Sequence, residues 1–308
     1  MADNLTLGII FALSAGIANN IGALLQKHAI NKIPKEEREK EFFKKLIKNP
    51  YWVLGLILIL GASGALFSLA HVFIGGALIP GLSAVGLIVL TVGAVKILGE
   101  KLNVTEYIGM ASMIAGIVLI GLSALEITDG DMVNLTDTYF LIRLAIYSVV
   151  FFILWITSRK LGKRVEKGKT IFLALGAGFP FALTNAWLQP FIFLFRELIK
   201  GNFTTLNIIL FIISLLIVGV ISILGIAHVQ DAFRHGNASI VYPLGGVPQQ
   251  IAPVILFYGI YLKSSPQTYS IYILIVGIII VLTAGFLLGR KQGLLETMEL
   301  EKEEKDVS

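Results

Sequence analysis

Nine stretches of about twenty consecutive, mostly apolar residues constrain the fold of this chain more than any other feature. Such a stretch is long enough to cross the hydrocarbon core of a bilayer as a helix. The strands of an outer-membrane barrel would instead alternate in polarity, and these stretches do not. The sequence therefore predicts an all-α polytopic membrane protein, with transmembrane helices near Thr6–His28, Tyr51–Phe73, Ile79–Leu98, Val104–Leu125, Thr138–Ser158, Thr170–Phe195, Leu206–Val229, Ser239–Leu262 and Thr268–Leu288.

Positive charge is distributed unevenly between the connecting segments. Lys and Arg gather in 32–48 and 159–169, whereas 126–137 contains acids and no base. Basic loops remain on the cytoplasmic side of a membrane, so the amino terminus is predicted outside and the carboxyl terminus inside. Arg196, Lys200 and Lys263 are exceptions to this scheme. Orientation in a cell membrane thus explains the net charge of +5, and no nucleic-acid partner is expected.

A short repeat divides the chain into two related halves. Ser68-Leu-Ala-His-Val72 returns as Gly225-Ile-Ala-His-Val229, and Leu78-Ile-Pro80 parallels Val241-Tyr-Pro243. Spans 1–4 therefore match spans 6–9, and the extra fifth span inverts the second copy in a 4+1+4 inverted repeat. The predicted organisation is a first four-helix repeat over 1–125, a linker with the fifth helix over 126–169, a second repeat over 170–289 and a charged cytoplasmic tail over 290–308.

Two segments outside the spans have their own predictions. Within 32–48, Phe42, Phe43, Leu46 and Ile47 are predicted to share one face of a short amphipathic helix on the membrane surface. The tail Glu296–Ser308 is rich in acids and poor in apolar residues, so we expect it to be disordered.

Polar side chains within the spans mark a candidate pathway. An unsatisfied amide is costly in hydrocarbon, so these groups should turn toward the inside of the bundle. Helical spacing gathers them on one face in spans 1, 6 and 8. The predicted pathway residues are Asn19, Gln26, Asn185, Gln189, Tyr242, Gln249 and Gln250. The alternative is that each amide bonds a neighbouring helix and lines no cavity.

Three further residues are candidates for gating or ion coupling. His71 and His228 occupy equivalent places in the two copies, and imidazole titrates near neutral pH. Glu100 ends the third span. For the histidines, a structural hydrogen bond at a helix end is the alternative. No Asp or Glu lies in the middle of a span, which disfavours a carboxylate ion site there, and metal ligands stay unassigned.

Enzymatic chemistry has little support in the sequence. The chain has no cysteine, which excludes disulfides and thiol catalysis. Gly61-Ala-Ser-Gly64 matches the Gly-x-Ser-Gly of intramembrane serine proteases, but small-residue stripes produce this match by chance. We expect no enzyme and no cofactor, with an intramembrane serine protease as a remote alternative. The same small residues pack helices together or form the face of a homodimer.

Several motifs resemble a known family. Pro80, Leu98-Gly-Glu-Lys-Leu102 and Ala115-Gly-Ile-Val-Leu119 are similar to the EamA repeat of the drug/metabolite transporter superfamily. Within it, Gln26-Lys-His28, Asn49-Pro-Tyr-Trp52 and Asn237-Ala-Ser-Ile-Val-Tyr-Pro243 are most similar to the NIPA-like magnesium transporters. The resemblance implies secondary transport by alternating access between two inverted bundles. The second copy departs from the pattern, with Tyr261-Leu-Lys263 in place of Leu98-Gly-Glu100.

The substrate is less readily carried over from the resemblance. Proteins usually hold Mg²⁺ through carboxylates and several waters. The predicted pathway offers amides and a phenol instead, which suit a polar organic molecule as well as a hydrated ion. The leading prediction is a transporter of a small polar solute across the bilayer. A magnesium ion transporter is the alternative, and coupling to a proton or another ion stays open.

Overall fold

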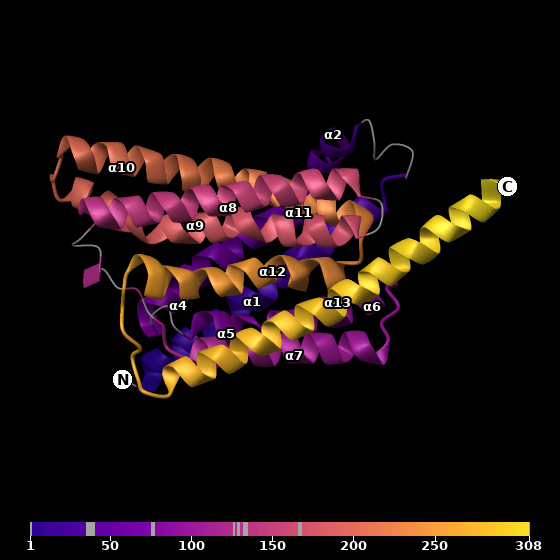
Figure 1. The fold of residues 1–308 in the computed structure, drawn as a ribbon, viewed down its shortest axis with the longest axis horizontal. Helices are drawn as coiled ribbons and strands as arrows, with labels where there is room; N and C mark the ends of the chain where they lie inside the picture. The colour runs from indigo at the N-terminus through magenta and orange to yellow at the C-terminus, as the bar shows by residue number, and fades with distance from the viewer. Residues whose placement is uncertain are drawn as a thin grey trace.

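The computed structural model describes residues 2–34, 41–74, 78–125, 127, 130–131, 135–165 and 168–307. In this part of the chain all regular structure is helical, and nine helical spans are long and apolar enough to cross a membrane, which confirms the prediction. Figure 1 shows them packed lengthwise in one bundle. The spans are α1 (Ala2–Asn31), α3–η2–α4 (Pro50–Ile57, Leu58–Ser63, Gly64–Ile74), α5–α6 (Ile79–Ser83, Gly86–Lys96), α7 (Val104–Leu122), α8 (Thr138–Arg164), α9 (Lys169–Ile199), α10–η4–α11 (Thr205–Leu216, Ile217–Ile221, Ser222–His235), α12–η5 (Ala238–Ile255, Leu256–Ile260) and α13 (Ser270–Val307).

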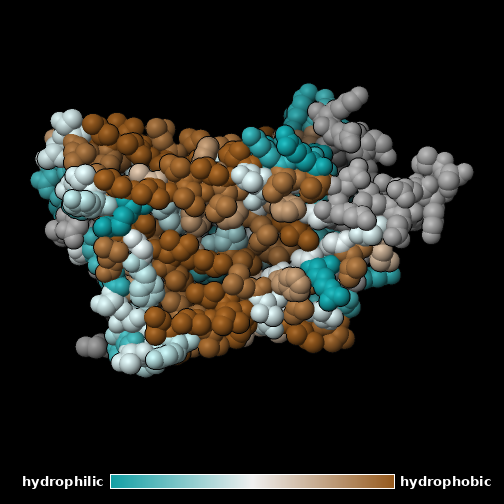
Figure 2. All heavy atoms as spheres, in the orientation of Figure 1, coloured by the Kyte–Doolittle hydropathy of each residue, from teal (hydrophilic) through white to brown (hydrophobic). Residues whose placement is uncertain are grey.

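The sides of the bundle are apolar. Figure 2 shows brown, hydrophobic residues over most of the visible face, with hydrophilic residues gathered toward the two ends. Large apolar side chains project outward, among them Val72, Ile223 and Phe286, which are 66–78% exposed. A soluble monomer rarely exposes a continuous apolar surface of this kind. The helices therefore present their apolar faces to lipid while satisfying their own backbone hydrogen bonds.

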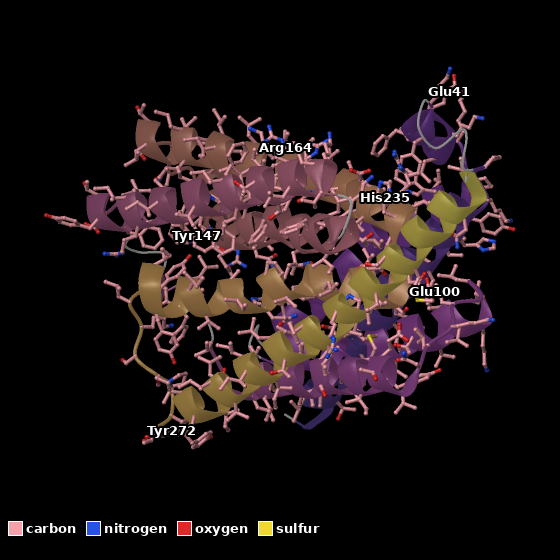
Figure 3. The ribbon with its side chains drawn as sticks, turned by 45° about the vertical axis from the view of Figure 1, so that its right-hand side comes forward. Glu41, Glu100, Tyr147, Arg164, His235 and Tyr272 are labelled. Atoms are coloured by element: carbon pink, nitrogen blue, oxygen red, sulfur yellow. The ribbon has the colours of Figure 1, made fainter. Side chains whose placement is uncertain are left out.

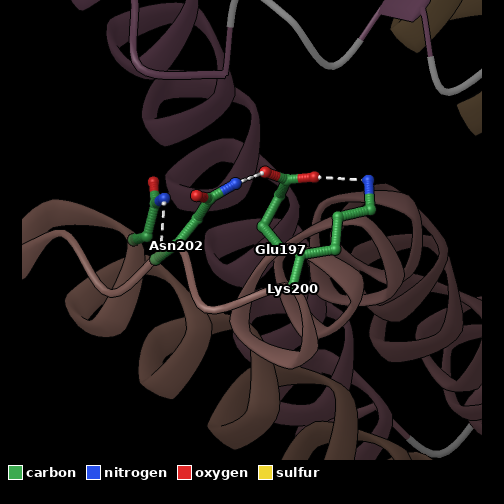
Figure 4. Close-up of polar contacts among 4 residues, drawn as sticks. Glu197, Lys200 and Asn202 are labelled. Carbon is green, nitrogen blue, oxygen red and sulfur yellow. Dashed lines mark hydrogen bonds and ion pairs between the residues drawn. The ribbon is translucent and has the colours of Figure 1, made fainter.

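Polar residues fix the points at which the spans begin and turn. The Asn103 side chain accepts from Glu106 N, and the Glu106 carboxylate accepts from Asn103 N in return, which caps both free amides at the start of α7. Between α9 and α10, Glu197 accepts from Lys200 at 2.9 Å and from Asn202 at 2.5 Å (Figure 4). These contacts close the loops so that consecutive spans run in opposite directions.

Matching glycines bring equivalent helices together in the two halves. A Cβ on Gly16 of α1 would lie 2.1 Å from Ser83 O, and one on Gly178 of α9 would lie 2.1 Å from Gly245 O. Only glycine permits backbones to approach so closely. In the sequence repeat the two contacts lie within one residue of corresponding places. A close helix crossing thus occurs in each predicted repeat, and the inverted 4+1+4 organisation stays a prediction.

Two further features recur in both halves. The second and seventh spans each contain one π-helical turn, η2 and η4, at corresponding places. The last spans of the two halves, α7 and α13, pack against each other, with Gly116 and Gly277 in reciprocal contact. This contact joins the halves along one side of the bundle.

The two predictions outside the spans have different outcomes. The predicted short helix is present as α2 (Phe42–Ile47), with Phe42 and Leu46 buried in the protein core and Phe43 and Ile47 exposed. At about 100° per residue these four apolar residues fall within one arc of about 140°, and the place of the helix on the membrane surface stays a prediction. The tail is helical rather than disordered, because α13 continues to Val307 (Figure 1). Its Leu, Glu, Met and Lys residues favour helix.

Candidate functional site

A cavity of about 420 Å³ lies between the two halves of the bundle. Figure 2 shows pale, hydrophilic atoms set back between the hydrophobic layers in the middle of the molecule. The cavity is lined by residues from the first four spans and from spans 6, 7 and 8. Its polar side chains are Asn19, Asn20, Gln26, Ser63, Ser83, Asn185, Gln230, Tyr242, Gln249 and Gln250.

Six of the seven predicted pathway residues line this cavity. They come from three helices of both halves, α1, α9 and α12, as helical spacing indicates: Asn19, Gln26, Asn185, Tyr242, Gln249 and Gln250. The exception is Gln189. It lies on the same face of α9 as the lining residues Ala177, Phe181 and Asn185, but one turn beyond the cavity. Whether the six residues contact a substrate stays a prediction.

One hydrogen bond joins the halves across the cavity. Asn19 Nδ2 of α1 donates to the Tyr242 hydroxyl of α12 at 2.6 Å. The neighbouring Asn20 turns back on its own helix and donates to Gly16 O, which leaves Asn20 Oδ1 without a partner. Gln249 donates to Gly245 O at 3.1 Å. The carbonyl oxygens of the Asn19 and Gln249 side chains stay available as acceptors, because only their amide nitrogens are used in these bonds.

A hydrogen bond between two amide side chains also joins the halves. Gln230 Nε2 of α11 donates to Gln26 Oε1 of α1 at 2.7 Å, and both side chains are nearly fully buried. The remaining amide atoms, Gln26 Nε2 and Gln230 Oε1, have no partner. A buried donor or acceptor in this condition is destabilising by about 1–3 kcal/mol. The pair therefore keeps one free donor and one free acceptor beside the cavity.

Four polar lining residues were not predicted, namely Asn20, Ser63, Ser83 and Gln230. Asn20 and Ser83 bond to backbone carbonyls of their own helices, as polar residues in spans commonly do, and Ser63 donates to Ala15 O of α1, so the sequence does not mark these three as lining a cavity. The sequence does not predict Gln230, because the apolar run ends at Val229. The helix α11 in fact continues to His235 and carries Gln230 beside α1.

The cavity is polar but carries no acidic side chain among the described lining residues. Across the described part of the chain, no group of three or more His, Asp or Glu residues could hold a metal ion. Amide and hydroxyl oxygens are weaker ligands for a bare divalent cation than carboxylates are. The chemistry of the lining instead suits hydrogen bonding to a polar or hydrated species.

The gating candidates lie outside the cavity lining. His71 is half-buried on α4. His228 is buried on α11, where its Nδ1 accepts from the side chain of Trp155 at 2.8 Å rather than bonding a helix end. Glu100 is buried after α6 and accepts hydrogen bonds from the first residues of α12. A role for any of the three in gating stays a prediction.

The protease alternative lacks its catalytic pair. Ser63 Oγ donates to Ala15 O at 3.0 Å, and His228 is bonded to Trp155. Ser63 lines the cavity, whereas His228 does not. A serine nucleophile requires a base within hydrogen-bond reach, and this histidine does not serve.

Comparison with protein families adds a direct assignment. The family model described as "Magnesium transporter NIPA" matches residues 3–294, nearly the whole chain. The chain belongs to the NIPA magnesium transporter family. This confirms the resemblance seen in the motifs, since the NIPA family lies within the EamA/drug-metabolite transporter-like superfamily. No curated protein and no solved structure matches the chain.

Membership of the NIPA family indicates a membrane transporter rather than an enzyme. Magnesium is therefore at least as well supported as the small polar solute that is the leading prediction from the sequence. The lipid bilayer and an ion substrate are the partners that fit such a protein.

Proposed function

We propose that this protein carries Mg²⁺ across the membrane as a hydrated ion, through the cavity between its two halves. The observation that carries the proposal is the cavity itself, about 420 Å³ in volume and lined by amide and hydroxyl groups from both halves. Six waters around an octahedral Mg²⁺ occupy about 180 Å³, at about 30 Å³ for each water. The cavity therefore accommodates the ion with its first hydration shell.

The lining explains how an ion could bind without a carboxylate. Mg²⁺ gives up its waters reluctantly, so a transporter that keeps them avoids a large desolvation cost. The bound waters would donate hydrogen bonds to side-chain oxygens, and Asn185, Gln249 and Gln250 offer these at the cavity surface. Such a site binds weakly enough to release the ion.

The two-half architecture supports alternating access as the mechanism. Asn19–Tyr242 and Gln26–Gln230 are hydrogen bonds between the halves, so a relative movement would break and re-form a small set of contacts. Inverted repeats that enclose a central site commonly work in this way. A cell membrane with the carboxyl terminus in the cytoplasm stays our expectation from charge.

The test is magnesium flux into vesicles that contain the purified protein and an enclosed Mg²⁺ indicator. Asn185→Leu should reduce flux by about tenfold or more, because it removes an oxygen acceptor from the cavity. Gln189→Leu is the matched control on the same helix, one turn outside the lining, and should retain flux. Equal flux in the two variants would remove Asn185 from the pathway, and no flux in wild-type vesicles would refute Mg²⁺ transport.

A small polar organic solute is the second candidate. It is favoured by the lack of an acidic lining residue and by Phe67, Phe181 and Tyr242, which offer aromatic surface to an organic molecule. Counterflow of labelled metabolites into the same vesicles, without added Mg²⁺, would support this substrate class.

A further inference from the structure

Two charged side chains of the first half hold the corner between α11 and α12 of the second half. The corner comprises residues Phe233–Ser239 and lies at the end of the bundle where α6 and α8 finish, here named the basic end. Figure 3 shows Glu100 and His235 together at this end, with Tyr272 at the opposite end. Both charged residues, Lys27 and Glu100, are more than nine-tenths buried.

Glu100 binds the start of α12. Its carboxylate accepts from Ala238 N at 2.6 Å, Ser239 N at 3.1 Å and Ser239 Oγ at 2.5 Å. The Asn237 side chain makes no capping bond, so Glu100 takes the place of a local cap. A carboxylate at a helix start is stabilised by the free amides and by the helix dipole.

Lys27 binds the end of α11. Its ammonium group donates to Phe233 O and to Gly236 O, the latter at 2.8 Å. A cation at a helix end complements the free carbonyls and the negative end of the dipole. Each charge is therefore placed on the helix end that attracts it, and both come from the other half, Lys27 from α1 and Glu100 from the segment after α6.

Among the described residues, the positions equivalent to Lys27 and Glu100 make different contacts. In the sequence repeat, Lys27 corresponds to Pro190 and Glu100 to Lys263. Lys263 forms an ion pair with Asp131 of the linker at 2.7 Å, and so binds outside the two repeats. The contacts of Lys27 and Glu100 therefore distinguish the basic end from the opposite end.

The corner lies next to the amide pair in the cavity. Gln26 directly precedes Lys27 on α1, and Gln230 lies on the last turns of α11 before Phe233. Both glutamines line the cavity, so a movement of the corner away from α1 would change the lining at this end. The two charged contacts hold the corner closed beside them.

We propose that the α11–α12 corner is the gate at the basic end, and that Lys27 and Glu100 are the positioning residues that hold it closed. The inference rests on the proposed transport function. In the transport cycle, the corner would move away from α1 and Glu100, and water would reach Gln26 and Gln230. The structure is then the conformation closed at the basic end.

Thiol accessibility tests this without any transport measurement. The chain has no cysteine, so a single introduced one is the sole reactive thiol. Ala238→Cys places it at the corner, where the native side chain is fully buried, and Ala182→Cys places a control thiol in a separate buried cluster on α9. Purified protein in detergent is treated with a charged, water-soluble methanethiosulfonate, and the labelling rate is measured.

With the corner thiol, Glu100→Gln and Lys27→Gln should each speed labelling by about tenfold, the change expected for losing one charge-assisted hydrogen bond. The Ala182→Cys thiol should stay unreactive in both, which separates gate opening from unfolding. Lys101→Gln, an exposed charge next to Glu100, is the matched control and should leave labelling unchanged. If Glu100→Gln does not fold, Ser239→Ala removes one of the three bonds and should speed labelling to a smaller degree.

Two results would overturn the gate. One is equal labelling of the corner thiol with and without Glu100 and Lys27, in protein that remains folded. The other is rapid labelling with both charges in place, which would mean that the corner is already open. Failure of the transport proposal is distinguishable, because faster labelling in the variants together with no Mg²⁺ flux in wild-type vesicles would keep the gate and reject the substrate.

Discussion

The crossing of α9 and α12 gives a prediction whose size follows from the coordinates. In Gly178→Ala, the new Cβ would lie 2.1 Å from Gly245 O and 2.9 Å from the Pro248 ring. Ordinary contacts begin near 3.4 Å, so the helices must separate by roughly 1 Å. Overpacking of this kind is destabilising by about 1–3 kcal/mol, and backbone atoms, which cannot rotate away, place it at the upper end.

Alanine also favours helix over glycine by about 1 kcal/mol, so the net loss should be about 2 kcal/mol. The assay is thermal unfolding of purified protein in detergent. Gly219→Ala is the control, because no atom lies within 4 Å of its Cβ position, and it should match or exceed the wild-type melting temperature. Gly16→Ala should behave like Gly178→Ala if the repeat is structural. If Gly178→Ala has the same melting temperature as Gly219→Ala, at or above the wild-type value, the close crossing is refuted.

Three other substitutions distinguish residues that line the cavity from residues that only pack around it. Gln230→Leu removes the amide pair and should reduce flux by about tenfold, whereas Gln189→Leu should not; equal flux in both would contradict the assignment of the cavity lining. Tyr242→Phe loses the hydroxyl that accepts from α1 and should lower flux by about fivefold, equivalent to about 1 kcal/mol, with little change in melting temperature. Trp155→Phe leaves the buried His228 Nδ1 without a donor and should lower stability by about 1–3 kcal/mol with normal flux in the folded fraction; an unchanged melting temperature would contradict it.

The spans and most of the cavity could be predicted because both depend on the contrast between apolar and polar residues. In hydrocarbon, an amide must find a partner or a cavity, so Asn19, Asn185 and Gln249 stand out in their helices. The inward face then follows from helical spacing alone, and the structure places all three on the cavity.

The contacts at the basic end could not be predicted, because they join residues far apart in sequence. Lys27 has the appearance of an interfacial lysine that orients a helix, and nothing local indicates that it binds α11. Gln230 follows the last apolar residue of its run and so looks like the start of a loop. Its place in the cavity depends on six further residues being helical, which packing against α1 and α9 supports.

The central claim is that the cavity between the halves is the path of Mg²⁺, and blocking it chemically is the most direct test. Asn185→Cys would place the sole thiol of the chain on the cavity surface, and Gln189→Cys would place it one turn outside. Mg²⁺ flux into vesicles is measured before and after treatment with a bulky methanethiosulfonate. We predict that treatment stops flux in Asn185→Cys and leaves it unchanged in Gln189→Cys. Undiminished flux through fully labelled Asn185→Cys protein would contradict the account.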